Sequence, residues 1–324
     1  MNEEFFDLEV RSHTRESDSV VSLLLEHPLG EELPAWEAGA HIDVLLPNGL
    51  LRQYSLCSEP AERSSWRLGI LREPAGRGGS AYVHDELKPG TKIQVRGPRN
   101  NFPLAEAGSY LFLAGGIGIT PILPMLREAS RRGAPWRLVY LGRSRSSMAF
   151  RDEVAGLQGA SGTVHLHADD EGGLYPLAGL LEGLDPETHV YTCGPGPLLN
   201  AISSMVSGWT DPARLHYERF AADPAAQAAA SSPGDHEFIV ETADGTEVLV
   251  PPSTTILEAL EAAGINQPNS CREGICGTCE TTVLSGEPDH RDTLLSDEER
   301  AAGETMMICV SRCKGRRLVL DLYS

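Results

Sequence analysis

Four cysteines near the C-terminus have the spacing of a metal centre. Cys271, Cys276 and Cys279 lie in CREGICGTC, with the spacing C-x4-C-x2-C, and Cys309 follows after 29 intervening residues in MMICVSRC. This is the plant-type spacing for a [2Fe–2S] cluster held by four thiolates. The sequence therefore predicts these four cysteines as ligands of an iron–sulfur cluster.

The residues around the cysteines bear on the alternatives. Gly274 and Gly277 would let the loop turn its backbone N–H groups toward sulfur. A zinc site usually has two C-x2-C pairs, whereas only Cys276 and Cys279 form one here. Disulfides would need an oxidising compartment, and no secretory signal marks the chain. We therefore favour the cluster over zinc and over disulfides.

Composition and charge limit the class of protein. A length of 324 residues predicts two or three domains, and the acidic start MNEEFFDLEV is unlike a signal peptide, so we expect a cytoplasmic protein. The net charge of −19 argues against nucleic acid and anionic membranes as partners. Residues 235–324 hold 17 acids and 7 bases, a net charge of −10. That excess suits either a docking face for a basic partner or solubility alone.

Two boundaries divide the chain. ADPAAQAAASSPGD (222–235) has no aromatic and no long aliphatic residue, which is typical of a linker. A softer boundary lies near 103–109, between a part rich in short strands and the apolar strand YLFLAGG. We place domains at 1–104, 105–222 and 235–324, with a linker at 223–234.

Residues 5–100 alternate short β-rich runs with turn signals, which predicts an antiparallel barrel. The strand LRQYSLC (51–57) contains the motif R-x-Y-S, in which Arg52 and Tyr54 share a face. An arginine beside an aromatic ring suits a ligand that has a phosphate and a flat ring. GRGGSAYVHD (76–85) predicts a glycine turn followed by a helix whose N-terminus could bind that phosphate. Each motif alone is weak, but the two together predict a flavin site.

The middle of the chain predicts a nucleotide-binding α/β domain. YLFLAGGIGITPILPMLREASRRG (110–133) reads as a strand, a glycine turn and a helix. The loop GGIGITP differs from G-x-G-x-x-G, but Gly115, Gly116 and Gly118 would still admit a pyrophosphate and Thr120 could add a hydroxyl. We count HVYTC (189–193) as the third strand, and it ends in the glycine turn CGPGP.

The set and order of these motifs resemble the ferredoxin–NADP reductase superfamily, in particular its phthalate dioxygenase reductase branch, which includes vanillate O-demethylase reductases. The resemblance implies a multidomain protein with an antiparallel β-barrel flavin domain, an α/β parallel-sheet nicotinamide domain and an α+β β-grasp plant-type ferredoxin domain. It also implies FMN as the flavin. The implied flavin contacts are Arg52, Tyr54, Ser55, Ile70, Gly78, Gly79 and Ser80, and Ser55 is in addition a candidate catalytic residue.

The resemblance also assigns nicotinamide contacts. Arg143 and Ser144 would meet the adenosine ribose; they could hold a 2′-phosphate, yet relatives generally prefer NADH, so we expect NADH with NADPH as the alternative. Cys193, Gly194 and Pro195 would lie beside the nicotinamide and the flavin. Cys193 is a candidate catalytic residue that shapes the site, the alternative being a small buried thiol beneath the turn.

Two further segments carry expectations. In LHYERF (215–220), Phe220 would shield the flavin ring as a third candidate catalytic residue, or it would be an ordinary core residue. HEFIVETADGTEVLV (236–250) predicts a hairpin with a DG turn, followed by a helix. The DHRD run at 289–292 would contact the flavin domain or the partner, or it would form an ion-paired loop, and we favour the loop.

The implied function follows from the parts. Nicotinamide gives two electrons as a hydride and the cluster accepts one at a time, so the flavin would connect them. We expect a reductase that serves a separate Rieske-type non-haem iron oxygenase docking near the ferredoxin domain. The alternatives are a cytochrome P450 or diiron hydroxylase as acceptor, or a non-catalytic flavin and iron–sulfur redox sensor.

Overall fold

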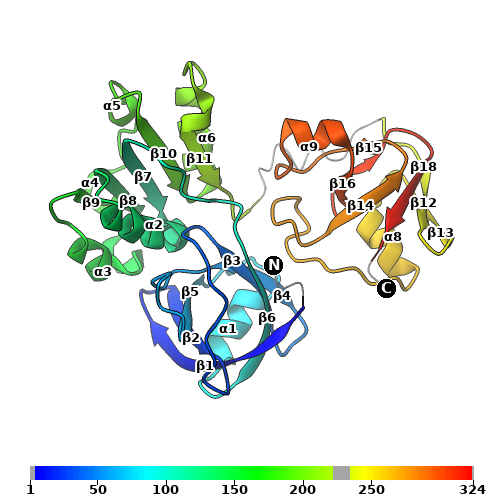
Figure 1. The fold of residues 1–324 in the computed structure, drawn as a ribbon, viewed down its shortest axis with the longest axis horizontal. Helices are drawn as coiled ribbons and strands as arrows, with labels where there is room; N and C mark the ends of the chain where they lie inside the picture. Colours follow the sequence, from blue (N-terminus) through cyan, green and yellow to red (C-terminus); the bar gives the residue numbers. More distant parts are fainter. Residues whose placement is uncertain (1–3, 222–233, 323–324) are drawn as a thin grey trace. The chain divides into compact units, whose positions relative to one another are not determined.

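The computed structural model describes residues 4–221 and 234–322, and the chain folds into two compact units, Met1–Arg219 and Phe220–Ser324 (Figure 1). Except for Gly234, the predicted linker at 223–234 lies outside the described residues. No helix in the described ranges has the length and apolar character needed to cross a membrane.

The first part of unit Met1–Arg219 is the predicted antiparallel barrel. Its sheet has the order β4-β3-β6-β1-β2-β5, and a single bridge between Leu56 and Leu68 links the two end strands. The short helix α1 (Gly79–Asp85) follows β5. The strands are β1 (Phe6–Arg15), β2 (Val20–Glu26), β3 (His41–Leu45), β4 (Leu51–Ser55), β5 (Ser65–Leu71) and β6 (Lys92–Arg99).

The second part is a parallel sheet of order β11-β10-β7-β8-β9. Its strands are β7 (Ser109–Gly115), β8 (Trp136–Gly142), β9 (Gly162–Ala168), β10 (Thr188–Cys193) and β11 (Leu215–Glu218). Its helices are η1 (Gly116–Gly118), α2 (Ile119–Arg131), η2 (Arg145–Ser147), α3 (Arg151–Gly156), α4 (Asp169–Gly172), α5 (Ala178–Leu181), α6 (Gly196–Val206) and η3 (Pro212–Arg214). β7 is an almost continuous buried run, as expected for a strand in the middle of a parallel sheet.

One strand count was wrong. HVYTC lies in β10, which is the fourth strand of this sheet along the chain, because β9 precedes it. β9 has the sequence GTVHLHA and lies at the edge of the sheet, where only one neighbour pairs with it. Its exposed polar positions dilute the apolar signal that central strands give, so the sequence pattern did not reveal it.

The barrel and the parallel-sheet part share one hydrophobic core. Val20, Ala38 and Cys57 of the barrel belong to the same buried cluster as Phe112 of β7 and Ile119 of α2. Burial of apolar surface between the two parts stabilises their contact. This common core explains why residues on both sides of the predicted boundary near 104 form a single compact unit.

Unit Phe220–Ser324 has its own sheet, of order β13-β12-β18-β14-β16, and its own core. The predicted hairpin is present, with Gly245 at φ +87° in its turn, and α8 begins at a capping box of Thr255 and Glu258. The elements are β12 (Phe238–Thr242), β13 (Glu247–Val250), α8 (Ile256–Ala262), β14 (Glu280–Ser285), β15 (Pro288–Asp289), α9 (Asp297–Ala302), β16 (Thr305–Met307), β17 (Arg312–Cys313) and β18 (Arg317–Asp321). Mixed β pairing with a packed helix fits the expected β-grasp class.

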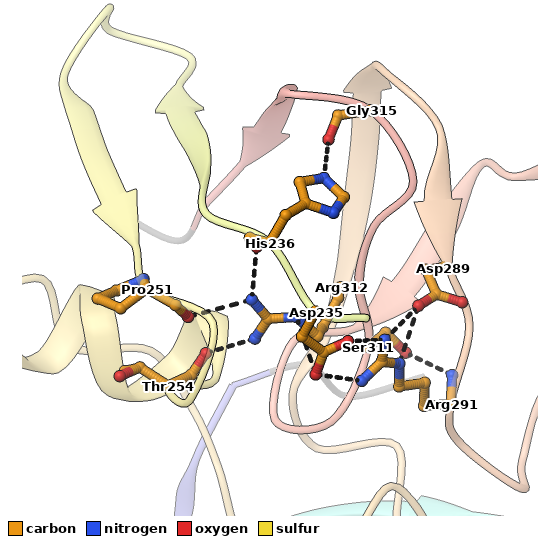
Figure 2. A network of polar contacts seen from close by, with 9 residues as sticks. All are labelled: Asp235, His236, Pro251, Thr254, Asp289, Arg291, Ser311, Arg312 and Gly315. Atoms are coloured by element: carbon orange, nitrogen blue, oxygen red, sulfur yellow. Dashed lines mark hydrogen bonds and ion pairs between the residues drawn. The ribbon is translucent and has the colours of Figure 1, made fainter. Parts of the chain in front are cut away.

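Figure 2 shows a polar network that ties the start of this unit to its C-terminal half. Arg291 makes a two-pronged ion pair with Asp235 (2.6 and 3.0 Å) and also pairs with Asp289 (2.6 Å). The buried guanidinium of Arg312 donates to three backbone carbonyl oxygens, those of Thr254 (2.7 Å), His236 (3.1 Å) and Pro251 (3.1 Å). Residues 289–292 thus make ion pairs within this unit, as the favoured interpretation held, although Asp289 ends the short strand β15 instead of lying in a loop.

We predict that Arg312→Ala destabilises this unit strongly, because three carbonyl groups would each lose one donor and Asp235 would lose a nearby cation (3.7 Å). The expected loss in the free energy of unfolding is about 3 kcal/mol or more. Urea unfolding followed by the visible absorbance of the cluster measures it. Arg317→Ala is the control, since Arg317 is exposed and water screens its pairs with Glu241 and Glu247. Equal losses in both variants would contradict the prediction.

Candidate functional site

The two predicted flavin motifs meet at one place on the barrel. Arg52, in β4, donates to the carbonyl oxygens of Leu51 (2.7 Å) and Arg77 (2.8 Å). Its side chain lies over Gly79, where a Cβ would be 2.4 Å from Arg52 Nε. Burial and the charge of Arg77 lower the pKa of Arg52. In the described part of the chain no carboxylate pairs with Arg52, so its positive charge is available to an anion such as a phosphate.

The remaining residues of these motifs surround that arginine. Gly78 precedes α1 with φ +80°, a left-handed conformation that favours glycine. The Ser80 hydroxyl accepts a hydrogen bond from the backbone N–H of Glu73 (3.0 Å), which fastens the loop to the helix. Tyr54 is half-buried, and burial raises its pKa to about 12, so its hydroxyl keeps its proton. Ser55 ends β4 and is buried.

Ile70 does not belong with this group. Its side chain is 1% exposed and packs in the barrel core, and its carbonyl accepts from the ring of His84 (2.9 Å). Ile70 is the last residue but one of β5, and its apolar side chain points into the core because that burial is favourable. A flavin contact through this side chain is therefore not available, which corrects the prediction for Ile70.

The loops GGIGITP and CGPGP pack backbone against backbone. A Cβ at Gly118 would lie 2.1 Å from the carbonyl oxygen of Cys193, and a Cβ at Gly194 would lie 2.9 Å from Gly115 Cα. A Cβ at Gly115 would in turn lie 2.7 Å from Pro195 Cδ, just before α6. Such distances exclude any side chain, so these glycines hold the two loops together at one edge of the parallel sheet.

Thr120 has a different role from the one predicted. Its hydroxyl donates to the carbonyl oxygen of Ile117 (2.9 Å) and the residue is 2% exposed, so the hydroxyl is not free for a phosphate. Gly116, by contrast, has φ +54° and open space where a Cβ would be. Gly116 therefore leaves space for a nucleotide at the surface of this loop, and Thr120 stabilises the turn beneath it.

Arg143 and Ser144 lie at the end of β8, as expected for the ribose side of the loop. Arg143 is exposed. The Ser144 hydroxyl accepts from the backbone N–H of Ser147 (3.3 Å) and forms a capping box at the start of η2. Beside them, Arg145 makes an ion pair with Glu171 (2.8 Å).

The sequence analysis did not single out Glu218, a partly buried acid next to CGPGP whose Oε2 atom is enclosed by protein. Glu218 pairs with Cys193 in the parallel register of β10 and β11. Among the described residues, neither its Oε2 atom nor the hydroxyl of neighbouring Thr192 has a hydrogen-bond partner. Burial raises the pKa of Glu218 to about 8, and burial raises the pKa of the fully buried Cys193 as well. The Cys193 thiol thus packs beneath the turn, as the alternative interpretation held, and a protonated carboxyl lies beside it.

Phe220 lies two residues beyond β11 and is 43% exposed. A core position would have left a phenylalanine with little exposed surface, so the interpretation of Phe220 as an ordinary core residue is wrong. An exposed aromatic ring at this point is available to cover a flat ligand.

The four predicted cluster cysteines gather in unit Phe220–Ser324. The thiol of Cys271 lies beside those of Cys276 and Cys309, and Cys309 lies beside Cys279. Three of the four are buried, and none of the chain's cysteines is in a disulfide. Within the described ranges no group of three His, Cys, Asp or Glu side chains is arranged to hold a single metal ion. A binuclear cluster instead takes two thiolates on each iron, which a chain of neighbouring thiols can supply.

The loop around these thiols fits a cluster. The backbone N–H of Glu273 donates to Cys271 Sγ (3.3 Å), and Gly274 makes a backbone hydrogen bond to the Cys309 sulfur. Gly274 and Gly277 have φ of +70° and +76°, and a Cβ at Gly274 would lie 2.6 Å from Val310 Cγ2. Four soft donors with N–H groups aimed at sulfur are the features expected for iron–sulfur ligation.

Comparison with known proteins agrees with this architecture. Residues 7–103 match the family described as oxidoreductase FAD-binding domain, residues 112–204 the oxidoreductase NAD-binding domain, and residues 240–314 the 2Fe-2S iron-sulfur cluster binding domain. The chain is 45% identical over 309 residues to a phenoxybenzoate dioxygenase subunit beta from Ectopseudomonas oleovorans, covering 94% of each protein.

Two solved structures are similar along almost the whole chain. Phthalate dioxygenase reductase, described as a modular structure for electron transfer from pyridine nucleotides to [2Fe–2S], has a TM-score of 0.71 and 37% identity and covers 98% of both chains. An intact type IV self-sufficient cytochrome P450 monooxygenase has a TM-score of 0.85 and 41% identity, with 98% of this chain matching 41% of that one.

The fold and the site define a modular oxidoreductase that passes electrons from a nicotinamide nucleotide through a flavin to a [2Fe–2S] cluster. The chain belongs to the phthalate dioxygenase reductase branch of the ferredoxin–NADP reductase superfamily. The predicted family, the three-part fold class and the use of flavin, nicotinamide and cluster are thereby confirmed.

We predict that Glu218 makes stability fall with rising pH. The unfolded carboxyl ionises near pH 4.5 but the folded one only near pH 8, so its contribution is complete below 4.5 and is lost as pH rises to 8. The slope in this window is up to about 1.4 kcal/mol per pH unit. Glu218→Gln should remove this dependence of the free energy of unfolding on pH. Urea unfolding followed by flavin fluorescence at pH 5, 6.5 and 8 measures it in both proteins. Identical slopes in both proteins would mean that Glu218 is ionised in the folded state.

Proposed function

We propose that this chain is the reductase component of a two-protein oxygenase system, in which it supplies electrons to a separate Rieske-type oxygenase acting on an aromatic or related substrate by ring hydroxylation or O-demethylation. The observation that carries the proposal is the match along 94% of the chain to a dioxygenase subunit. The described residues supply sites for reducing an acceptor, and the reaction with oxygen belongs to the partner.

For the flavin we propose FMN, held by Arg52, Tyr54, Ser55, Gly78, Gly79 and Ser80. The position of Arg52 over Gly79 supports a terminal phosphate there. When bound, the flavin accepts a hydride and releases electrons singly. The surrounding residues orient it, and we assign Phe220 to covering its ring and Ser55 to a position beside it.

For the nicotinamide nucleotide we propose NADH, held by the backbone of Gly115, Gly116 and Gly118 and by the turn Cys193, Gly194 and Pro195, with Arg143 and Ser144 at the ribose. Thr120 is not included. The ion pair between Arg145 and Glu171, with Asp170 nearby, supports NADH because this arginine is neutralised and acidic groups repel a 2′-phosphate. NADPH remains the alternative that the titration below tests.

For the cluster we propose Cys271, Cys276, Cys279 and Cys309 as ligands, and we propose that the oxygenase docks near them. The first turn of α9 carries the acidic residues Asp297, Glu298 and Glu299, which suit a partner with a basic surface. We place the protein in the cytoplasm, where free thiols persist.

A second candidate acceptor is a cytochrome P450, because the self-sufficient monooxygenase contains a region 41% identical to this chain. A Rieske oxygenase and a P450 would both accept single electrons from the cluster. Reconstitution with each purified acceptor separates them, since only the true partner should give product formation coupled to NADH oxidation.

The function is tested by anaerobic titration of the purified protein with NADH and then NADPH, followed by absorbance and low-temperature EPR. We expect flavin bleaching together with the EPR signal of a reduced [2Fe–2S] cluster, and NADH as the better donor. Flavin reduction without a cluster signal, in protein that contains iron and sulfide, would refute the electron path. A protein reduced by neither nucleotide would support the redox-sensor alternative.

We predict that Arg52→Met weakens flavin retention at least about ten-fold, because a charge-assisted contact to phosphate is worth about 1.5–3 kcal/mol. Flavin content after dialysis and the dissociation constant from fluorescence measure the effect, and mass spectrometry of the released flavin distinguishes FMN from FAD. Arg11→Met is the control, since Arg11 lies on β1 and its guanidinium pairs with Glu9 and Glu26 instead of facing the glycine turn. Unchanged affinity in Arg52→Met would place the phosphate elsewhere.

A further inference from the structure

The barrel and the nicotinamide part touch at a glycine. Gly69 lies in the middle of β5, and a Cβ there would be 2.7 Å from Thr120 Cγ2 and 3.0 Å from Phe150 Cε2. Thr120 belongs to the loop GGIGITP, and Phe150 begins α3. A glycine within a strand often marks such a close approach of another segment. The strand of one cofactor domain thus lies directly against the nucleotide loop of the other.

An ion network surrounds this contact. Arg67, two residues before Gly69, makes a two-pronged ion pair with Glu153 of α3 (2.7 and 2.9 Å). Arg127 of α2 pairs with the same carboxylate and reaches Glu59 of the barrel at 3.7 Å. The side chains of Arg67, Arg127 and Glu153 are only 19–29% exposed, so water screens these charges less than those of a surface pair.

The same network reaches the segments that carry both predicted sites. Arg67 donates to the carbonyl oxygen of Cys57 (3.0 Å), two residues beyond the R-x-Y-S motif. Its guanidinium also lies over the ring of Phe150, 4.9 Å from the centroid. Phe150 has φ +55°, an unfavourable conformation for a bulky residue, which persists only where its surroundings hold it. Through Arg67 and Arg127, the carboxylate of Glu153 therefore connects β5 with α2, and Arg67 also contacts the strained Phe150.

We propose that Glu153, with Arg67 and Arg127, holds the nicotinamide loop GGIGITP in register with β5 of the flavin barrel and so sets the distance over which the hydride moves. These three are positioning residues, since none of them lies in the glycine loops. Hydride transfer needs the reacting atoms within about 3–3.5 Å, and a displacement of about 1 Å costs up to about a hundred-fold in rate. The inference rests on the proposed reduction of the flavin by NADH.

The test is stopped-flow reduction of the complete protein by NADH under anaerobic conditions. In Glu153→Gln we expect the limiting rate of flavin bleaching to fall about ten-fold or more, with the half-saturating NADH concentration changed less than about three-fold. The charge-transfer absorbance between flavin and nicotinamide should weaken, and the isotope effect with NADH deuterated at the transferred position should rise. A merely structural loss would move the melting temperature and flavin content but neither of these signals.

Glu128→Gln is the matched control. Glu128 also accepts from two arginines, Arg131 and Arg132, but all three belong to α2 and its end, so the rate should stay within about two-fold of the unchanged protein. Arg67→Lys keeps the charge and removes the two-pronged geometry, and it replaces Glu153→Gln should that variant fail to fold. Unchanged rates and charge-transfer absorbance in these variants would overturn the inference, whereas an unchanged protein that NADH does not reduce would overturn the proposed function itself.

Discussion

The nicotinamide side of the site depends on the approach of one backbone to another. The carbonyl group of Cys193 occupies the space that a side chain at Gly118 would fill, and Gly194 lies equally close to Gly115. Because both contacts involve backbone atoms, no side-chain rotation could relieve a substitution there. The end of β10 and the start of α2 are therefore held together through their backbones. The pairing of β10 with β11 in turn places the buried carboxyl of Glu218 beside Cys193.

That carboxyl has an energetic cost. Oε2 of Glu218 and the Thr192 hydroxyl lack partners in the described part of unit Met1–Arg219, and an unpaired buried polar group typically costs about 1–3 kcal/mol. Proteins usually retain such groups where chemistry needs them. A neutral acid next to a neutral thiol gives the end of β10 polar atoms without a net charge, which suits the nicotinamide site that we propose there.

Short-range patterns in the sequence were enough to predict the cluster loop, the barrel strands and the glycine loops, since each of these depends on residues that are neighbours in the chain. Features that depend on tertiary contacts were missed. Thr120 looked like a phosphate ligand, yet its hydroxyl closes its own turn and its methyl group meets Gly69. The pairing of Arg67 with Glu153 spans 86 positions, and no local pattern predicts it. The isolated glycine at position 69 was the one available signal of that contact.

The flavin and nicotinamide parts form one compact unit, whereas the ferredoxin part forms the other. The chemistry gives a reason for this division. Hydride transfer makes and breaks bonds, so the flavin and nicotinamide parts need fixed geometry, and they share a core and an ion network. Single-electron transfer to the cluster breaks no bond in the donor. The ferredoxin part accordingly has a core of its own, and buried Arg312 secures its first strand internally. The division of the chain therefore follows the division between two-electron and one-electron chemistry.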